Sequence, residues 1–380
     1  MELVLRYGVT LLSALLIVAT ALPLSRSHRW WIRALDFPRL QIAVLICAVL
    51  LLAALVPWVL PPGPAGWEVV AGLGLSLLYQ LWRIAPFMPI WRKEMALVPA
   101  GPGDVVFLTV NVLQENTEYA RVRDLIRTVN PDVLLLMEVD QRWLDAMKPA
   151  LAPYATVLRE PQDNYYGMVF ATRLETPEAK MVLLTEDETP TLFAEMIAPG
   201  GQMFRFVGLH PKPPGPGEDT ELRDAHILYA ARFARKTEVP IVAMGDFNDV
   251  AWSDTSLRFK RVGGYLDPRI GRGLVSSFDA NRVFLRYPID QIYVSPEVAM
   301  VAFHRGDPVG SDHFPMIARL SFDLALARRH NRALQPMSDA EDREIEAKLA
   351  KYVERLHRGA SGDVLPPDDP ATASTSHRDE

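Results

Sequence analysis

Two polar residues, Asp246 and Asn248, follow an apolar run of β-branched and small residues at positions 239–244. Such a run is typical of a buried strand, and it breaks at Gly245. Residues two apart on an extended segment point to the same side, so we expect both side chains to emerge together at the strand end. A carboxylate there can accept a proton or orient a water, and a carboxamide can donate to a phosphate oxygen. Taken alone, the pair is also explained by a turn that ends a strand.

Polar side chains recur at the ends of other apolar runs in the same part of the chain. They are Asn111, Glu138, His210, Asp290, Asp312 and His313. Each one alone is explained by a capped strand end, a satisfied core histidine or a turn carboxylate. Together with Asp246 and Asn248 they form an oxygen-rich, imidazole-containing set without thiolates. Such a set suits Mg²⁺ or Mn²⁺ better than zinc, and Glu138 is its best metal carboxylate.

The elements that must position these residues alternate between strand-like and helix-like segments from residue 104 onward. The strand candidates are 105–113, 132–137, 167–172, 179–184, 192–197, 203–209, 239–244, 291–294, 298–303 and 316–321. Helix-like spacing is present at 117–129 and 222–233. Many strands with a few helices, some in β-α-β order, favour layered sheets covered by helices.

The first hundred residues contain three apolar runs, at about 3–24, 40–60 and 69–88. Runs of this length can cross the ~30 Å hydrocarbon core of a bilayer, so they predict about three transmembrane helices. A signal peptide is the rival interpretation of the first run, but no clear cleavage site follows it. Four arginines lie in the first loop and none in the second, and Arg92 and Lys93 follow the third run. The positive-inside rule then places everything after residue 92 in the cytoplasm.

Charge is unevenly distributed along the chain, whose formal net charge is −6. Lys plus Arg against Asp plus Glu number 8 and 4 in residues 1–100, 26 and 31 in 101–335, and 6 and 11 in 336–380. This distribution lowers the expectation of a nucleic-acid partner, which needs a basic face. The only cysteine, Cys47, lies in an apolar run and excludes disulfides within the chain.

Composition divides the chain into five parts. They are a membrane anchor at 1–98, a linker at 99–103, an α/β domain at 104–323, a polar helical extension at 324–358 and a disordered tail at 359–380.

The ordered set Asn111, Glu138, His210, Gly245-Asp-Phe-Asn248, Ile289-Asp290 and Ser311-Asp-His313 resembles the endonuclease/exonuclease/phosphatase superfamily, whose members include DNase I. The resemblance covers about residues 104–323. The stretch from Asp246 to Ser253 and the preceding apolar runs look most like a bacterial membrane-attached subgroup, the YafD-like proteins. The resemblance implies a four-layer α/β sandwich, in which two packed mixed sheets are flanked by helices, behind about three transmembrane helices.

The resemblance also implies roles for the polar set. Glu138 holds the metal ion, and Asp312 is a second candidate ligand. Asp246 orients or deprotonates the attacking water, with Asn248 and Asn111 fixing phosphate, water or the hydration shell of the metal. His313 acts at the scissile phosphate as base or electrostatic stabiliser, and which of Asp246 and His313 takes the proton stays open.

Further roles follow by the same resemblance. Asp290 holds the other ring nitrogen of His313 and sets its tautomer. His210 contacts the phosphate or the leaving group. Tyr165 or Tyr166 matches a phosphate-side tyrosine, with core packing as the alternative. Lys212 meets the substrate anion or is a solvated loop lysine.

Phosphoester hydrolysis with Mg²⁺ or Mn²⁺ is therefore the expected activity, by in-line attack of water on a phosphodiester or phosphomonoester. The substrate is not in the motif: a lipid headgroup, another phosphorylated small molecule or nucleic acid all remain open. The expected setting is a bacterial inner membrane, with the bilayer as partner and no obligate protein partner evident. The rival is a catalytically silent membrane-anchored interaction module on the same fold.

Overall fold

The computed structural model describes the whole chain apart from residues 184–188, 218, 234–238, 335–336 and 360–380. The chain divides into two compact units, residues 1–92 with 214–220 and residues 93–213 with 221–380. We call the first the helical unit and the second the sandwich domain. The tail that composition predicts to be disordered lies, beyond residue 359, outside the described residues.

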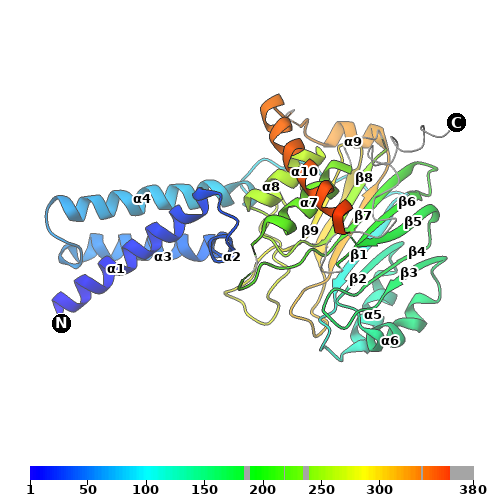
Figure 1. Ribbon diagram of the computed structural model, residues 1–380, viewed down its shortest axis with the longest axis horizontal. Coiled ribbons are helices and arrows are strands. Elements are labelled where there is room, and N and C mark those ends of the chain that lie inside the picture. Colours follow the sequence, from blue (N-terminus) through cyan, green and yellow to red (C-terminus); the bar gives the residue numbers. More distant parts are fainter. Residues whose placement is uncertain (184–188, 218, 234–238, 335–336, 360–380) are drawn as a thin grey trace. The chain divides into compact units, whose positions relative to one another are not determined.

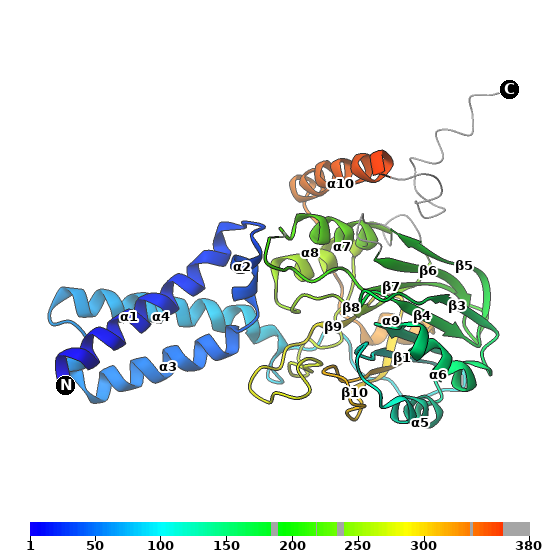
Figure 2. The ribbon, with the colours of Figure 1, turned by 60° about the horizontal axis from the view of Figure 1, so that its bottom comes forward.

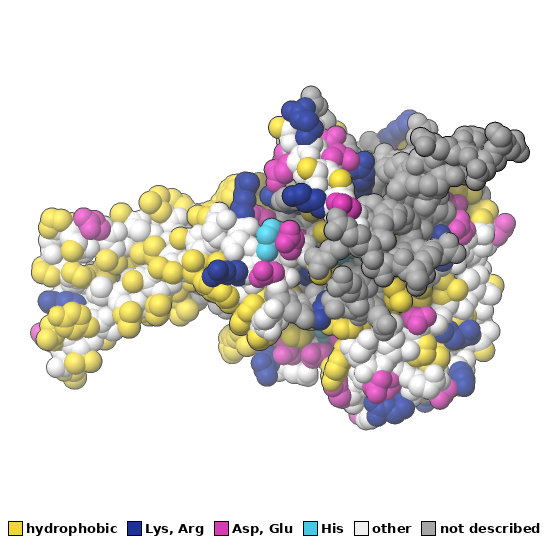
Figure 3. Space-filling model, viewed as in Figure 1, with side chains coloured by type: hydrophobic (Ala, Val, Ile, Leu, Met, Phe, Trp, Pro, Cys, Tyr) yellow, Lys and Arg dark blue, Asp and Glu magenta, His cyan; other side chains and the backbone are white. Residues whose placement is uncertain are grey.

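The helical unit is built from three long helices, α1 (Glu2–Ala21), α3 (Arg39–Leu55) and α4 (Pro64–Ile84), with the short α2 (Trp30–Arg33) between the first two (Figure 1). One apolar cluster holds the long helices together. Its buried members are Val9, Leu16, Ile42, Ile46, Val49, Val59, Leu60 and Leu73. Figure 3 shows hydrophobic side chains over most of the visible surface of these helices, as expected where a helix faces lipid instead of water.

Two helical segments, Glu2–Ser25 and Pro64–Phe87, are long and apolar enough to cross a membrane. A third span exists only if Trp30–Asp36 and Arg39–Leu55, which are bent by 69° at their break, are counted as one. The expected span at 40–60 is therefore too long at its carboxyl end. Its helix ends at Leu55 because Pro57 has no N–H to donate and disfavours helical geometry in the residue before it.

The sandwich domain contains a six-stranded and a five-stranded sheet. The first sheet has the order β10 (Ala299–Arg305), β11 (Met316–Ser321), β1 (Val105–Asn111), β2 (Val133–Met137), β4 (Met168–Thr172) and β3 (Thr156–Glu160). The second has the order β5 (Glu175–Leu183), β6 (Pro190–Ile197), β7 (Met203–Leu209), β8 (Ile241–Asp246) and β9 (Asp290–Val294). In each sheet one pair is parallel, β1 with β2 and β7 with β8, and the other pairs are antiparallel.

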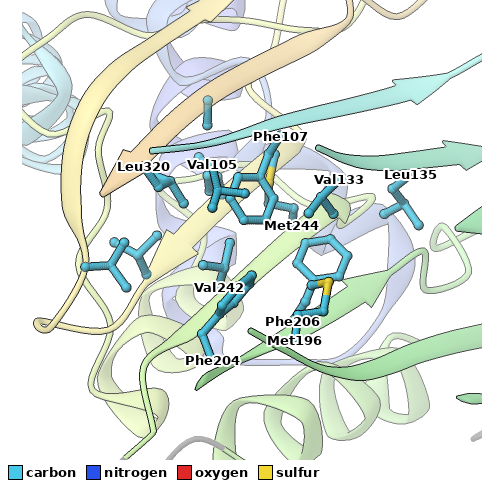
Figure 4. Packing of buried hydrophobic residues seen from close by; sticks show 14 of the residues in the cluster. Val105, Phe107, Val133, Leu135, Met196, Phe204, Phe206, Val242, Met244 and Leu320 are labelled. Carbon is cyan, nitrogen blue, oxygen red and sulfur yellow. The ribbon is translucent and has the colours of Figure 1, made fainter. Parts of the chain in front are cut away.

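The main core lies between the two sheets, where alternate residues of each strand point inward (Figure 4). Phe107 of β1 contributes from one sheet, and Phe204 and Phe206 of β7 contribute from the other. The ring centroid of Phe107 lies 6.1 Å from that of Phe204 and 5.8 Å from that of Phe206. All three rings are fully buried, so they join the sheets directly.

Truncating Phe107 to alanine should remove this link and leave a cavity between the sheets. We expect the Phe107→Ala variant to lose about 3–5 kcal/mol of unfolding free energy, and Phe107→Leu clearly less. Urea denaturation of the purified chain, followed by tryptophan fluorescence, measures both. Equal stability of the two variants and the unaltered protein would contradict this account of the core.

Helices cover the outer faces of both sheets, which makes four layers (Figure 2). The helices α5 (Tyr119–Val129) and α6 (Gln141–Leu151) pack on the outer residues of β1 and β2. On the other sheet lie α7 (Glu221–Phe233) and α8 (Asp254–Gly263). The α/β-sandwich prediction is confirmed.

Two further helices follow the last strand, α9 (Leu324–His330) and α10 (Asp339–Gly359). The segment of α10 belongs to the predicted polar helical extension, yet Ile345 and Leu349 are buried in the same cluster as residues of α7 and α8. An ion pair between Arg232 and Glu346 joins α7 to α10. The helix thus adds an amphipathic cover to this side of the domain.

Candidate active site

The strand topology brings the polar strand-end residues to one edge of the sandwich. In the first sheet, Asn111 is the last residue of β1 and pairs with Met137, the residue before Glu138. In the second sheet, the parallel partners Leu209 and Gly245 place His210 beside Asp246. Parallel strands end at the same edge of a sheet, so both pairs of side chains meet there.

The antiparallel neighbours complete this edge. Asp290 opens β9 directly opposite Asp246, because β9 runs against β8. The segment that carries His313 precedes β11, whose first residue Met316 pairs with Thr109 near the end of β1. A strand that starts where its neighbour ends contributes its first residues to the same edge.

Gly245 allows the close approach of β8 to β7 at this point. Its φ is +146°, and a Cβ at this position would lie 1.9 Å from the carbonyl oxygen of Leu209. Any other residue would therefore push the strands apart and separate Asp246 from His210. The glycine of the Gly245-Asp-Phe-Asn248 motif has a packing role that the site depends on.

The two carboxylate oxygens of Asp246 have separate partners. Oδ1 accepts from the backbone N–H of Asn248 at 2.8 Å, which is an Asx-turn. Asn248 itself has a φ of +49° and donates its side-chain Nδ2 to the carbonyl of Pro211 at 3.0 Å. The extended geometry expected from positions i and i+2 therefore stops at Asp246, and the turn instead of a strand sets the position of Asn248.

Oδ2 of Asp246 faces the other members of the site. It accepts from Asn111 Nδ2 at 3.1 Å and lies 3.6 Å from His313 Nε2 and 3.9 Å from His210 Nε2. The Asp246 side chain is 2% exposed. A single buried carboxylate oxygen thus lies near an amide and two imidazoles.

His313 is held by a buried carboxylate on its far ring nitrogen. Its Nδ1 lies 2.7 Å from Asp290 Oδ2, and its backbone N–H donates to Ser311 Oγ at 2.9 Å. Burial alone would lower the pKa of His313, but the charges of Asp290 and Asp246 outweigh it and raise the pKa to about 10. The ring is therefore an imidazolium at neutral pH, with both nitrogens as donors.

Glu138 is a carboxylate of this site whose pKa is raised by burial, as are those of Asp290 and Asp312. It follows β2 with a φ of +62°, a conformation that residues other than glycine hold mainly where the surroundings enforce it. Oε1 accepts from Asn111 Nδ2 at 2.8 Å, and Oε2 accepts from the backbone N–H of Gln114 at 3.3 Å. Burial is the largest influence on Glu138 and raises its pKa to about 7.

His210 is neutral, in contrast to His313. Burial lowers the pKa of His210 to about 4, against a smaller opposing influence of Asp246. Its Nδ1 is buried and has no hydrogen-bond partner in the described part of the chain. The ring of Tyr166 packs against it with a centroid distance of 5.6 Å. A buried imidazole with a spare nitrogen is suited to receive a ligand or water.

The remaining predicted site residues differ from one another in burial and in contacts. Asp312 is partly buried, with Oδ1 4.0 Å from His313 Nε2, and burial raises its pKa. Tyr165 is 47% exposed and donates its hydroxyl to Glu115, whereas the ring of Tyr166 packs against His210. Lys212 is partly buried in the segment that follows His210.

The sequence does not indicate two residues that help to position the site, Gln114 and Arg223. The backbone N–H of Gln114 reaches Glu138, and its side chain donates to Asp163 at 2.8 Å. Arg223 of α7 is buried and donates to the carbonyl of Asn248 at 3.2 Å. Both contacts join segments far apart in the sequence, so no local signal marks them. The nearest signal is the placement of Gln114 three residues after Asn111.

The donor set fits a hard divalent cation. Asp246, Asp290 and His313 are all buried, and they offer ligand atoms within 4.8 Å of one another. The short contact between Asp290 and His313 is already explained as a hydrogen bond, which leaves the oxygens of Asp246 and Glu138 as the better donors. Carboxylate and amide oxygens without thiolates are the ligands that Mg²⁺ and Mn²⁺ prefer.

The raised pKa of Glu138 predicts pH-dependent metal binding. A metal ion must displace the proton that Glu138 holds below its pKa of about 7, so we expect apparent Mn²⁺ affinity to rise with pH up to that point and to level off above it. Calorimetry in buffers of different ionisation enthalpy should show proton release at pH 6 and little at pH 8. The Glu138→Gln variant is the control and should lack this component; affinity that is flat with pH in the unaltered protein would contradict the prediction.

Two mixed sheets with a carboxylate–histidine centre at one edge define an α/β-sandwich protein with a candidate catalytic site. A model of the endonuclease/exonuclease/phosphatase family matches residues 108–313, which is more than half of the chain. The chain therefore belongs to the endonuclease/exonuclease/phosphatase family. No curated protein sequence matches the chain.

Several solved structures have a similar fold. An endonuclease/exonuclease/phosphatase from Bacteroides vulgatus is 20% identical, with 57% of this chain and 98% of that chain covered and a TM-score of 0.47. A mannosyl-6-phosphatase from Bacteroides thetaiotaomicron is 18% identical, with 57% and 100% covered and a TM-score of 0.45. The human nocturnin catalytic domain, with a bound sulfate anion, is 16% identical, with 60% and 97% covered and a TM-score of 0.48.

Proposed function

We propose that the protein is a membrane-anchored, Mg²⁺- or Mn²⁺-dependent phosphoesterase that hydrolyses a phosphodiester or phosphomonoester by in-line attack of water. The observation that carries this proposal is the convergence of Asp246, Asn111, His313 and Glu138 within hydrogen-bonding or ion-pairing distance at one edge of the sandwich. Membership of the family supports the same reaction class.

Asp246 and His313 divide the work at the reacting phosphate. The pKa of about 10 keeps His313 protonated, so its Nε2–H donates to a phosphate oxygen and stabilises negative charge in the transition state. A protonated ring is a poor base, which leaves Oδ2 of Asp246 to orient the attacking water and take its proton. Asp290 keeps His313 charged and fixes the direction of its ring.

Glu138 and Asn111 form the metal side of the site in this proposal, with Asp312 as a further candidate ligand. If Mg²⁺ or Mn²⁺ were held there, it would polarise the phosphoryl oxygen and neutralise charge on the leaving oxygen. Asn111 links the two sides, since its Nδ2 donates to both Glu138 and Asp246. Neutral His210, whose Nε2 lies 3.9 Å from Asp246 Oδ2, would contact the phosphate or the leaving group in this proposal.

The bilayer is part of the proposed setting. The span Pro64–Phe87 is followed by Arg92 and Lys93. After the first span, Arg26 and Arg29 lie in the loop, and Arg33 and Arg39 lie in the bent helical pair that follows it. Under the positive-inside rule, with three spans, the sandwich domain faces the cytoplasm of a bacterial inner membrane. A catalytically silent module on the same fold is the alternative, and the chemically competent residue at each site position argues against it.

The test uses the full-length chain in lipid nanodiscs. It is assayed with Mg²⁺, Mn²⁺ or EDTA against phospholipids, sugar and inositol phosphates, an abasic oligonucleotide and plasmid DNA. The proposal predicts turnover of at least one phosphoester that EDTA abolishes and Mg²⁺ or Mn²⁺ restores. A folded protein that binds these metals and turns over none of the substrates would favour the silent module.

A further inference from the structure

A loop beside the site exposes a run of large apolar side chains. Val283, Phe284 and Leu285 are 67%, 88% and 41% exposed. In the described part of the sandwich domain, no other three consecutive large apolar residues are all exposed. Soluble surfaces normally avoid such runs, and those that persist usually mark a contact with another molecule or with a membrane.

The loop has a fixed shape that presents this tip. The backbone N–H of Phe278 donates to the carbonyl of Tyr287 at 3.0 Å, and that of Asp279 donates to Leu285 at 3.1 Å. The N–H of Leu285 donates to Arg282 at 3.2 Å. These bonds close residues 278–287 into a hairpin-like loop in the segment between α8 and β9, which projects from the domain in Figure 2. The apolar run is therefore held outward by the backbone.

The base of the loop is bonded directly to the site. The N–H of Ala280 donates to the carbonyl of Asp312 at 2.7 Å, and the rings of Phe278 and His313 lie 5.0 Å apart. A molecule that touches the tip is thus within one short loop of His313.

Three arginines, Arg282, Arg286 and Arg305, lie in or beside this loop. The side chain of Arg282 is 70% exposed, and its Nε lies 3.6 Å from Asp279 Oδ2 in the same loop. The guanidinium groups of Arg286 and Arg305 lie 5.1 and 3.9 Å from the ring centroid of Phe314, the residue after His313. In an anionic membrane leaflet, acyl chains lie beneath a layer of phosphate groups. The apolar tip can contact the acyl chains while the flanking arginines contact the phosphates.

We propose that the loop 278–287 contacts an anionic lipid bilayer, with Val283, Phe284 and Leu285 entering the interfacial region and Arg282, Arg286 and Arg305 binding lipid phosphates. The short chain connection between the apolar span and the sandwich domain favours a membrane over a soluble molecule as the partner of this loop. The apolar span ends at Phe87 and the sandwich domain begins at Lys93, so little chain separates the domain from the membrane. The inference deepens the proposed function, on which it rests, by making phosphorylated membrane lipids the favoured substrate class.

The experiment measures membrane contact without turnover. The exposed cysteine Cys47 is first replaced by alanine, and a fluorophore is attached through Phe284→Cys or, as a second position, Val283→Cys. The control label is Arg127→Cys on α5, where the side chain is 80% exposed. Full-length protein is placed in nanodiscs that carry nitroxide lipids, with either phosphatidylcholine alone or about 30% phosphatidylglycerol added.

The proposal predicts severalfold stronger quenching at positions 283 and 284 than at position 127. Quenching should increase with phosphatidylglycerol and fall when Arg282 and Arg286 are both changed to glutamine. Equal quenching at all positions would overturn the proposal. Labels at positions 283 and 284 that are shielded by added oligonucleotides, but not quenched by the nitroxide lipids, would also overturn it. Because the readout is independent of catalysis, it can fail while phosphoester turnover persists, and turnover can fail while membrane contact is observed.

Discussion

Replacing His313 with glutamine is expected to reduce phosphoester turnover by about 10²–10⁴-fold, mainly in kcat. The physical reason is the loss of a buried positive charge that faces the reacting phosphate. Glutamine retains a hydrogen-bond donor of similar length but carries no charge, and it leaves the carboxylates of Asp290 and Asp246 without their cation. Steady-state kinetics on the best substrate measure the effect.

The Asp290→Asn variant tests the same charge from the other side. Without this carboxylate the pKa of His313 should fall from about 10, because Asp290 is the largest influence that raises it. Turnover is then expected to decline on the alkaline side at a lower pH than in the unaltered enzyme, with less change at pH 6. An identical alkaline limb in both proteins would show that a charged His313 is not required.

Replacing Glu138 with glutamine should weaken Mg²⁺ binding by at least about 100-fold, since even the loss of residues that only support a metal ligand costs about 10–100-fold. Glutamine has one acceptor oxygen in place of two, so it keeps only one of the bonds from Asn111 and Gln114, and it removes the negative charge. Turnover at low Mg²⁺ should be lost and partly recovered at high Mg²⁺. Calorimetry and a Mg²⁺ titration of activity measure the two effects.

A matched control for Glu138→Gln is Glu118→Gln, whose side chain is 52% exposed and pairs with Arg121 on the surface. This variant should bind Mg²⁺ and turn over substrate as the unaltered protein does. Glu138→Gln with unchanged Mg²⁺ dependence would assign the metal to other oxygens, of which Asp246 and Asp312 are the nearest candidates.

The site residues at strand ends can be predicted from the sequence. Apolar runs identify β1, β2, β7 and β8, and parallel pairing explains why Asn111, Glu138, His210 and Asp246 gather at one edge. The sandwich architecture follows from the family resemblance and is confirmed. The membrane spans depend on one more local rule, since a proline at position 57 shortens α3 to a length that composition alone overestimates.

Contacts between segments far apart in the sequence could not be predicted from it. The turn at Asn248 has left-handed geometry, supported by Arg223 of α7 through a bond across 25 positions of the chain. Gln114 reaches Glu138 and Asp163 in the same way. The exposed run Val283-Phe-Leu285 reads as an ordinary apolar segment until the fold shows which side chains remain outside. Each of these depends on tertiary packing, for which hydrophobic periodicity carries no signal.

The most direct test of the central claim is turnover of a phosphoester by the Asp246→Asn variant in the presence of saturating Mg²⁺. Asparagine preserves the shape of the side chain and an acceptor for the Asn248 turn, but it cannot take a proton from water. We predict a loss of about 10²–10⁴-fold in kcat with the fold unchanged, and no loss in the surface variant Asp124→Asn. Full turnover by Asp246→Asn would contradict the assignment of this site as the catalytic centre.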